Sequence, residues 1–373
     1  MEQKTLEQLT EILHHFLPTS NPRSIRAFGD GHINDTFAVE TPEEGESNYV
    51  LQRINTNVFL NADALMENIS NVTEYLKEQL DVEPNTRWRT LVYLPCVDGK
   101  PYYRAEDGSC WRVYQFVANT KSIGPEATPT HFYESALAFG KFVKLLDRYP
   151  AETLHETIAS FHDTESRYRA LCLAAEQDVC CRKAEVLDDL SFVEERREEI
   201  PLLNRMRDRG ELPVRVTHND TKLNNVLFDA DTERSVCVID LDTVMPGLLA
   251  YDYGDAIRFG ANKAEEDATD LDSVGIDLDK FATFTDGFLH YGQGTITRKE
   301  IETLPLAART LTLECGMRFL TDYLNGDVYF KTSHPKHNLE RARNQFRLVA
   351  DMEAHTDEMQ RLVFELAKKN HIL

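Results

Sequence analysis

The sequence lacks three features that would place it in particular classes of protein. No apolar run approaches the roughly 18 residues needed to cross a bilayer. No C-x-x-C pair occurs among the seven cysteines, and their odd number argues against a disulfide framework or a zinc site. Basic residues are scarce, since 41 lysines and arginines stand against 63 acidic residues and give a formal net charge of −22. These absences predict a cytoplasmic protein with reduced thiols that binds neither membrane nor nucleic acid.

The composition is that of an ordinary globular protein. The chain has 373 residues, of which 42% are hydrophobic and 28% charged, which suits about two domains. Near the N-terminus, five apolar residues recur at helical spacing: Leu6, Leu9, Ile12, Leu13 and Phe16. We interpret this stretch as an amphipathic helix and not as a signal peptide, because no basic segment precedes a continuous apolar core.

The order of the patterns predicts an α+β fold with two lobes. The first third contains short apolar runs and one helical segment, with strands predicted at 24–28, 36–40, 49–54, 90–97 and 109–117 and a helix at 61–80. Later segments are mostly helical, at 129–146, at 164–209 with an interruption at Pro201, and from about 264 onward, with short strands at 214–217, 226–228 and 235–239. We therefore expect a small β-rich lobe over residues 1–119 and a large, mainly helical lobe over residues 120–373.

The most informative segment contains Asp220, Asn225 and Asp240. Asp220 and Asn225 lie five residues apart in a polar loop that follows an apolar strand, and Asp240 comes 15 residues later at the end of another apolar strand. Where two strands end side by side, the side-chain oxygens of these three residues can lie close together. A lone aspartate in a loop is usually a turn former, but the joint pattern argues against that interpretation.

These residue types suit phosphoryl transfer from ATP. One carboxylate, assigned to Asp220, orients the attacking hydroxyl group and accepts its proton. Asn225 and Asp240 supply hard oxygen ligands that can hold Mg²⁺ on the phosphates. Lys222 can neutralise the charge of the migrating phosphoryl group. The acidic net charge does not exclude ATP, because a bound metal ion supplies positive charge locally.

A histidine, two aspartates and an asparagine complete a known motif. His218, Asp220 and Asn225 fit H-x-D-x-x-x-x-N, and an Ile-Asp pair follows at Asp240. This pattern resembles the aminoglycoside phosphotransferase-like kinases. Longer strings resemble the N-acetylhexosamine 1-kinases of that class, namely THNDTKLNNVLFD, VIDLDTVMPGLLAYDYGDAIRFGA and ECGMRFLTDYLNGD. The resemblance implies a protein-kinase-like fold, a buttressing role for Asp252, and phosphorylation of the anomeric hydroxyl group of a sugar.

Predicted nucleotide contacts lie in the first third of the chain. Gly29 and Gly31 fall in a loop between two predicted strands, where glycine lets the backbone approach phosphates, although G-x-G also occurs in ordinary turns. Arg53 stands where protein kinases carry a phosphate-binding lysine, with Glu67 as its helix partner. Alternatively, Arg53 is an exposed strand-end residue and Glu67 a surface residue.

The segment YQFVAN near the predicted lobe boundary is a candidate adenine contact. Its Phe116 would supply an apolar wall, and Ala118 would offer backbone groups to the ring. The alternative is an ordinary edge strand.

Five positions are candidates for substrate contact. The resemblance implies that His32, Phe259, Arg318 and Tyr329 touch the sugar, since an aromatic face stacks on a sugar ring and an arginine donates a fork of hydrogen bonds. Phe259 and Tyr329 could instead pack in a core, and Arg318 could form an ion pair. Asp242 could support the metal or contact the sugar, or it could be a solvated or capping carboxylate.

Together these observations predict an ATP- and Mg²⁺-dependent kinase of a small molecule, with an N-acetylhexosamine as acceptor and sugar 1-phosphate and ADP as products. The alternative is the same chemistry on homoserine, a choline-like amino alcohol or an aminoglycoside. A third interpretation is an inactive nucleotide-binding module. A protein kinase is disfavoured, because no Ala-Pro-Glu string follows Asp240.

Overall fold

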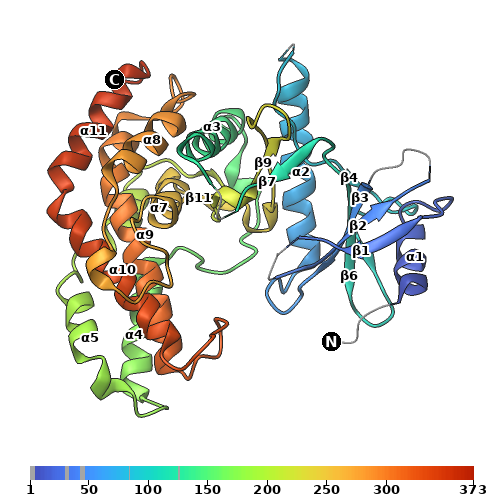
Figure 1. Cartoon of the computed structure of the whole chain (residues 1–373). Helices are drawn as coiled ribbons and strands as arrows, with labels where there is room; N and C mark the ends of the chain where they lie inside the picture. The colour runs from blue at the N-terminus through green and yellow to red at the C-terminus, as the bar shows by residue number, and fades with distance from the viewer. Residues whose placement is uncertain (1–4, 30–32, 43–46, 84, 125–126) are drawn as a thin grey trace. The chain divides into compact units, whose positions relative to one another are not determined.

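The computed structural model describes residues 5–29, 33–42, 47–83, 85–124 and 127–373. The chain forms two compact units (Figure 1). Unit 1 comprises Met1–Ser122, Glu152–Ala159 and Val226–Met245, and unit 2 comprises Ile123–Ala151, Ser160–Asn225 and Pro246–Leu373. The division into functional lobes after Asn119 stays a prediction.

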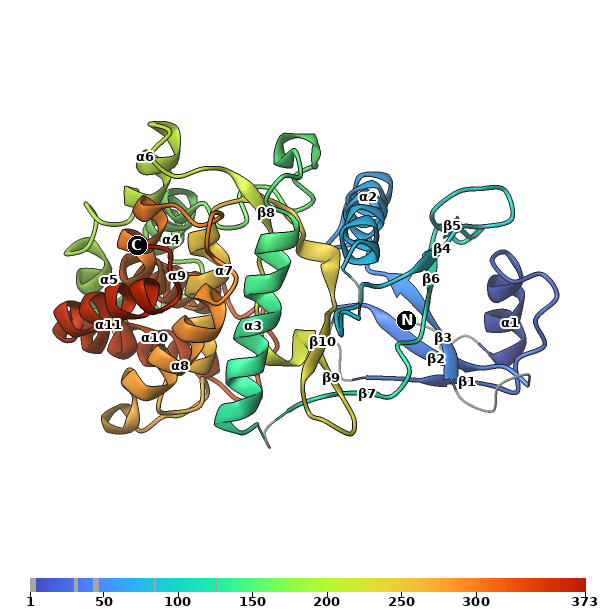
Figure 2. The ribbon, with the colours of Figure 1, turned by 90° about the horizontal axis from the view of Figure 1, so that it is seen from above.

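Unit 1 contains an antiparallel sheet with a helix on each face. The described strands follow the order β1-β2-β3-β6-β4, and β5 also pairs with β6. They span Ser24–Ala27 (β1), Asp35–Glu40 (β2), Ser47–Ile54 (β3), Tyr93–Leu94 (β4), Tyr103–Arg104 (β5) and Cys110–Gln115 (β6). Helices α1 (Leu6–His14) and α2 (Ala62–Asp81) lie on opposite sides of this sheet (Figure 2).

The two faces of the sheet differ in polarity, because successive side chains of a strand point to opposite faces. Leu51 of β3 is paired with Val113 of β6, and both are buried in the cluster that includes α1. The next pair in register, Gln52 and Arg112, therefore points to the other face. Arg112 reaches the sulfur of Met66 on α2, so the sheet places a cation between strand and helix.

A smaller antiparallel sheet also belongs to unit 1. Its order is β10-β9-β7, with β7 at Thr120–Ser122, β9 at Val226–Asp229 and β10 at Ser235–Val238. After β10 the chain passes through Asp240 into the 3₁₀ turn η4 (Leu241–Thr243) and then β11 (Met245–Gly247). Asp240 has a left-handed backbone with φ of 60°, so the chain turns sharply at this residue.

Unit 2 is mainly helical and is organised around α9 (Arg298–Leu324), against which α4, α7, α10 and α11 pack. The other helices span Pro129–Leu145 (α3), Thr164–Gln177 (α4), Leu187–Glu194 (α5), Leu202–Asp208 (α6), Leu249–Gly260 (α7), Leu278–Leu289 (α8), His337–Ala354 (α10) and Thr356–Lys369 (α11). Its short elements are the strand β8 (Arg215–Thr217) and the 3₁₀ turns Lys183–Glu185 (η2), Leu223–Asn225 (η3) and Leu271–Ser273 (η5). The 3₁₀ turn Ala151–Thr153 (η1) begins in unit 2 and ends in unit 1.

Close packing fixes α7 on α9. A Cβ atom at Gly254 would lie 2.5 Å from the carbonyl oxygen of Ala307, so the two helices approach to a distance that only glycine permits there. Asp252 and Asp255 flank this contact on α7. The contact therefore determines where these two carboxylates stand.

The predicted α+β class is confirmed, and most predicted elements are present. The segment 90–97 differs, since only Tyr93–Leu94 form a strand and Pro95 follows without an N–H group for the ladder. The segment 164–209 is three helices, because α4 ends at Asp178 in a left-handed conformation and α6 begins only after Pro201.

The structure can be compared with two expectations from the sequence, namely reduced cysteines and the lack of a membrane-spanning segment. All seven cysteines are described and carry free thiols. No helix within the described ranges is both long enough and apolar enough to cross a bilayer.

Candidate active site

The loop that follows β8 in unit 2 is held by two buried carboxylates, Asp252 and Asp255, and the backbone N–H of Thr221 donates to Asp255 Oδ2 at 3.2 Å. The backbone N–H groups of His218 and Asn219 donate to the two oxygens of Asp252 at 2.9 and 2.7 Å. The hydroxyl group of Thr221 donates to the Asp252 carbonyl at 2.6 Å. Asn219 needs this support, because its φ is 63°. The structure thus gives Asp252 the buttressing role implied by the sequence resemblance.

Burial raises the pKa of Asp252, and the nearby His218 ring and the two backbone donors oppose only part of that effect. The His218 ring is itself fully buried and stands edge-on to Phe139 and Phe142 at centroid distances of 5.4 and 6.0 Å. Its Nδ1 accepts from the backbone N–H of Asp220 at 3.3 Å. These contacts give His218 a structural part in holding the loop.

The same loop brings three predicted residues together. Lys222 Nζ lies 3.0 Å from Asp220 Oδ2. The amide nitrogen of Asn225 donates to the Asp220 carbonyl at 2.8 Å and to Oδ2 at 2.9 Å. An ammonium group and a side-chain amide therefore both contact the Asp220 carboxylate in this loop of unit 2.

The residues predicted to bind Mg²⁺ are suited to a hard cation. Because the Asn225 nitrogen is engaged with Asp220, its Oδ1 is left as the ligand atom, and this oxygen has no hydrogen bond to any described residue. Asp240 of unit 1 is exposed. Within the described ranges no group of three or more His, Cys, Asp or Glu residues could hold a metal ion, so a site would need the asparagine oxygen and phosphate oxygens as well.

Unit 1 contains a buried polar network that includes Asp242. Asp242 Oδ1 accepts from Arg112 Nη1 at 2.5 Å, and Oδ2 accepts from Asn34 at 2.6 Å. Gln52 Oε1 accepts from Arg112 Nε and Nη2 at 2.9 and 2.6 Å. Burial by itself lowers the pKa of Arg112, but the Asp242 carboxylate outweighs that effect and holds the pKa above its ordinary value.

This network corrects part of what the sequence suggested for Asp242. The residue is only 2% exposed, so it is neither a solvated nor a capping carboxylate. Both of its oxygens already accept hydrogen bonds inside unit 1, so a substrate would have to compete with Arg112 and Asn34. Contact with a substrate stays a prediction.

The predicted pair of Arg53 and Glu67 is absent from the ion pairs of the described residues. Arg53 lies 3.5 Å from Asp35, and Glu67 lies 2.9 Å from His155. The structure thus assigns each residue a different partner, and their roles at a nucleotide stay predictions.

The remaining nucleotide candidates are only partly described. Gly29 has a φ of 77°, whereas Gly31 and His32 lie outside the described residues. Phe116 follows the end of β6 and packs edge-on against Phe28 at 5.7 Å. The carbonyl of Ala118 accepts from Arg89 at 3.1 Å, which leaves its N–H group as the backbone group to read an adenine ring.

Three candidate substrate residues in unit 2 are not core residues. Phe259 and Tyr329 are 47% and 68% exposed, so core packing does not explain them. Arg318 forms no ion pair with any described residue, and its guanidinium lies over the rings of Phe161 and Phe330, 5.6 Å from each centroid. The plain structural alternatives for these residues are therefore wrong, while their contact with a substrate stays a prediction.

The family profile of the APH phosphotransferases, described as the phosphotransferase enzyme family, matches residues 24–282. This is more than half of the chain. The chain belongs to the phosphotransferase enzyme family. The prediction of a small-molecule kinase is thereby confirmed at the level of enzyme class, and nucleotide use follows as a family property.

Solved structures similar to this phosphotransferase confirm the protein-kinase-like fold. A microcompartment-associated aminopropanol kinase is 14% identical with a TM-score of 0.58, over 95% of this chain and 98% of that one. The GDP complex of aminoglycoside 2'-phosphotransferase-IIIa is 14% identical with a TM-score of 0.57, over 92% and 99%. Spectinomycin phosphotransferase with ADP and spectinomycin is 12% identical with a TM-score of 0.56, over 96% and 100%. At such identities the likeness concerns the fold.

Sequence reasoning missed two arginines of this phosphotransferase. Arg112 interrupts the apolar strand CWRVY, and a charge in such a run is a signal for a buried ion pair, since unpaired charges are rarely buried. Arg167 lies in a charged helix two residues before Arg169, and nothing in that pattern distinguishes the two.

Proposed function

We propose that this phosphotransferase transfers the γ-phosphoryl group of ATP to a hydroxyl group of a small-molecule alcohol, with Asp220 as the base. The observation that carries the proposal is the loop buttressed by Asp252, in which Lys222 and Asn225 lie 3.0 and 2.9 Å from the Asp220 carboxylate. A carboxylate fixed in this way can accept a proton without reorganising.

The proposed reaction is a direct transfer of one phosphoryl group between two oxygens. The acceptor oxygen attacks the γ-phosphorus, the bond from that phosphorus to the bridging oxygen breaks, and ADP leaves. The hydroxyl proton passes to Asp220 during or after the transfer. Lys222 offsets negative charge on the migrating group, because its ammonium is already beside the base. Positioning and electrostatics would account for most of the rate.

Asn225 and Asp240 would hold Mg²⁺. The metal would neutralise charge on the phosphates when bound. Support comes from the unbonded Asn225 oxygen and from the spacing of these residues in the sequence. Gly29, Gly31, Arg53, Phe116 and Ala118 would contact the nucleotide.

Two acceptor classes are candidates. The similar structures are those of kinases named for aminopropanol, aminoglycosides and spectinomycin, which favours an amine-bearing alcohol. The strings quoted above favour an N-acetylhexosamine phosphorylated at its anomeric hydroxyl group, with Phe259, Arg318 and Tyr329 as contacts. Arg318 argues against a cationic acceptor, because a cationic amine would be repelled by a guanidinium that forms no ion pair with the described residues.

An acceptor panel tests the proposal. The protein is incubated with ATP and Mg²⁺, and ADP release is followed with N-acetylglucosamine, N-acetylgalactosamine, aminopropanol, choline, homoserine and an aminoglycoside. We expect acceptor-dependent ADP release that is lost when Mg²⁺ is omitted. A folded protein that releases no ADP with any of these alcohols would contradict the proposal.

Asp220→Asn should lower turnover by about 10²–10⁴-fold, because the amide cannot accept the proton. Nucleotide affinity should be largely kept. The measurement is kcat with the best acceptor together with ATP binding by calorimetry. Asp208→Asn, an exposed aspartate of the same unit, is the control and should retain kcat. Near-normal turnover of Asp220→Asn would refute the assignment.

A further inference from the structure

Two arginines of unit 2 share one aromatic residue and have no carboxylate partner among the described residues. Arg167 Nη2 donates to the Phe161 carbonyl at 2.8 Å, and Arg318 lies over the Phe161 ring. The buried Nε of Arg167 has no hydrogen-bond partner within the described ranges. Neither arginine forms an ion pair in the part of the chain that the structure describes. Two positive groups thus lie together in a strongly acidic protein.

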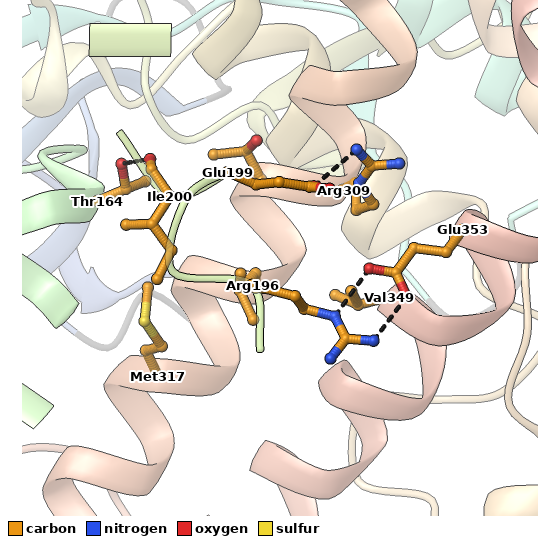
Figure 3. A pocket seen from close by; sticks show the side chains of 10 residues that line it. Thr164, Arg196, Glu199, Ile200, Arg309, Met317, Val349 and Glu353 are labelled. Atoms are coloured by element: carbon orange, nitrogen blue, oxygen red, sulfur yellow. Dashed lines mark hydrogen bonds and ion pairs between the residues drawn. The ribbon is translucent and has the colours of Figure 1, made fainter. Parts of the chain in front are cut away.

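Two other arginines of unit 2 form ion pairs with glutamates. Arg196 lies 2.7 Å from Glu353, and Arg309 lies 2.8 Å from Glu199 (Figure 3). These four side chains line a cavity with room for roughly one water molecule. Because both of its arginines are neutralised, this cavity gives no reason to expect an anion.

Carboxylates near Arg167 are committed elsewhere. An oxygen of Glu314 lies 3.2 Å from Nδ1 of His162. Asp163 caps α4, because its carboxylate accepts hydrogen bonds from the backbone N–H and the hydroxyl group of Ser166. Burial lowers the pKa of Arg167, and the charge of Arg318 lowers it further, while Glu314 opposes these effects in part. The two guanidinium groups therefore repel each other, and the protein supplies only part of the compensating charge.

The guanidinium groups of Arg167 and Arg318 keep N–H groups that can donate hydrogen bonds to a ligand. Rings on the faces of a guanidinium do not consume its in-plane N–H groups. Arg318 is partly exposed, so a solute can reach it, and the exposed Tyr329 stands next to Phe330 with ring centroids 4.8 Å apart. A planar or tetrahedral oxoanion could accept from both arginines and would remove their repulsion.

We propose that Arg167 and Arg318 form a binding site for an oxoanion, a carboxylate or a phosphate, carried by a small molecule. The proposal shares Arg318 with the acceptor contacts named above, but it does not depend on catalysis, since both arginines belong to unit 2. It adds Arg167 to the residues that select a ligand, and it predicts that the selected ligand is anionic.

Calorimetric titration without nucleotide tests the site. The full chain is titrated with inorganic phosphate, N-acetylglucosamine 1-phosphate and glucuronate. Uncharged N-acetylglucosamine is the comparison, and Arg167→Gln should leave its binding unchanged. Comparison of the first three shows whether a free ion, a phosphoester or a carboxylate is preferred. We expect at least one of them to bind, and Kd to rise roughly tenfold or more in Arg167→Gln and in Arg318→Gln, because each loses charge-assisted hydrogen bonds.

Arg169→Gln is the matched control, since Arg169 lies on the same helix, is exposed and pairs weakly with Glu165 at 3.9 Å. It should bind as the wild type does, and Arg167→Lys should recover part of the affinity. Circular dichroism establishes that each variant is folded. The proposal is overturned if no oxoanion binds the wild type, or if Arg167→Gln and Arg318→Gln bind as tightly as Arg169→Gln. Because no turnover is measured, either result leaves the proposed kinase activity untouched.

Discussion

Arg112 in unit 1 and the pair of Arg167 and Arg318 in unit 2 represent opposite ways of keeping guanidinium groups inside an acidic protein. Arg112 is 1% exposed and is fully engaged by Asp242 and Gln52. The two arginines of unit 2 have rings and a carbonyl beside them, and neither forms an ion pair with a carboxylate of the described residues. The charge of Arg112 is compensated by a carboxylate of the protein itself. The charges of Arg167 and Arg318 are not compensated in this way, so they can attract an anion from solution.

The contrast separates structural from ligand-binding charge. A buried ion pair contributes little net stability compared with an apolar replacement, but loss of one partner leaves a buried charge that is costly. A pair of unopposed cations has the reverse property, because removal of one relieves repulsion. Substitution of single residues should therefore give large effects in unit 1 and small ones at the unit 2 pair.

Arg112→Ala should have the largest effect, a loss of about 3–5 kcal/mol in the free energy of unfolding, because Asp242 is left buried and unpaired. Urea unfolding at neutral pH measures the change. Arg26→Ala on β1 is the control, since its contact with Glu40 is long at 3.9 Å and exposed, and it should change stability by less than about 0.5 kcal/mol.

A double variant, Arg112→Met with Asp242→Leu, sharpens this test. It should recover much of the stability lost in Arg112→Ala, because it removes both charges together. If Arg112→Ala unfolds with the same urea midpoint as Arg26→Ala, the charge of Arg112 is not compensated by Asp242 and the comparison fails.

The features that could be predicted from the sequence are those that depend on residues close together in the chain. Short apolar runs predicted strands β3 and β6, and the pattern around Asp220 and Asn225 predicted a polar loop that carries both side chains. The partner of Arg112 is 130 residues away, and a single sequence does not encode which distant carboxylate will be opposite. Arg167 differs from Arg169 only in the face of α4 that it occupies, which tertiary packing decides.

Arg258 of unit 2 forms an ion pair with Asp255, and the pH dependence of stability tests this pair. Burial alone would raise the pKa of Asp255, but Arg258, 2.9 Å away, holds that pKa below its ordinary value. The unfolded state then binds more protons, so this carboxylate stabilises the fold above an ordinary aspartate pKa of about 3.9 and the contribution is lost as the pH falls through the lower, folded value. Asp255→Asn lacks this contribution.

Urea unfolding from pH 6 to pH 3 measures the slope of stability against pH. We expect the stability of Asp255→Asn to fall less steeply below pH 4 than that of the wild type, while Asp279→Asn, an exposed aspartate of α8, keeps the wild-type slope. Because the variant also changes stability at neutral pH, the slopes and not the levels are compared. Equal slopes would show that Arg258 does not lower the pKa of Asp255.

Arg167→Gln should have the smallest effect, within about 0.5 kcal/mol of the wild type in the absence of oxoanions. The variant loses one hydrogen bond to the Phe161 carbonyl but also loses the repulsion with Arg318, and the two changes oppose each other. Arg258→Gln is the matched substitution at a compensated arginine and should cost at least about 2 kcal/mol, because it leaves Asp255 without its partner. Urea unfolding in a buffer free of phosphate and carboxylates compares the two. If both substitutions destabilise the protein equally, the charge of Arg167 is compensated within the fold as that of Arg258 is. The proposed difference between the two arginines would then be wrong.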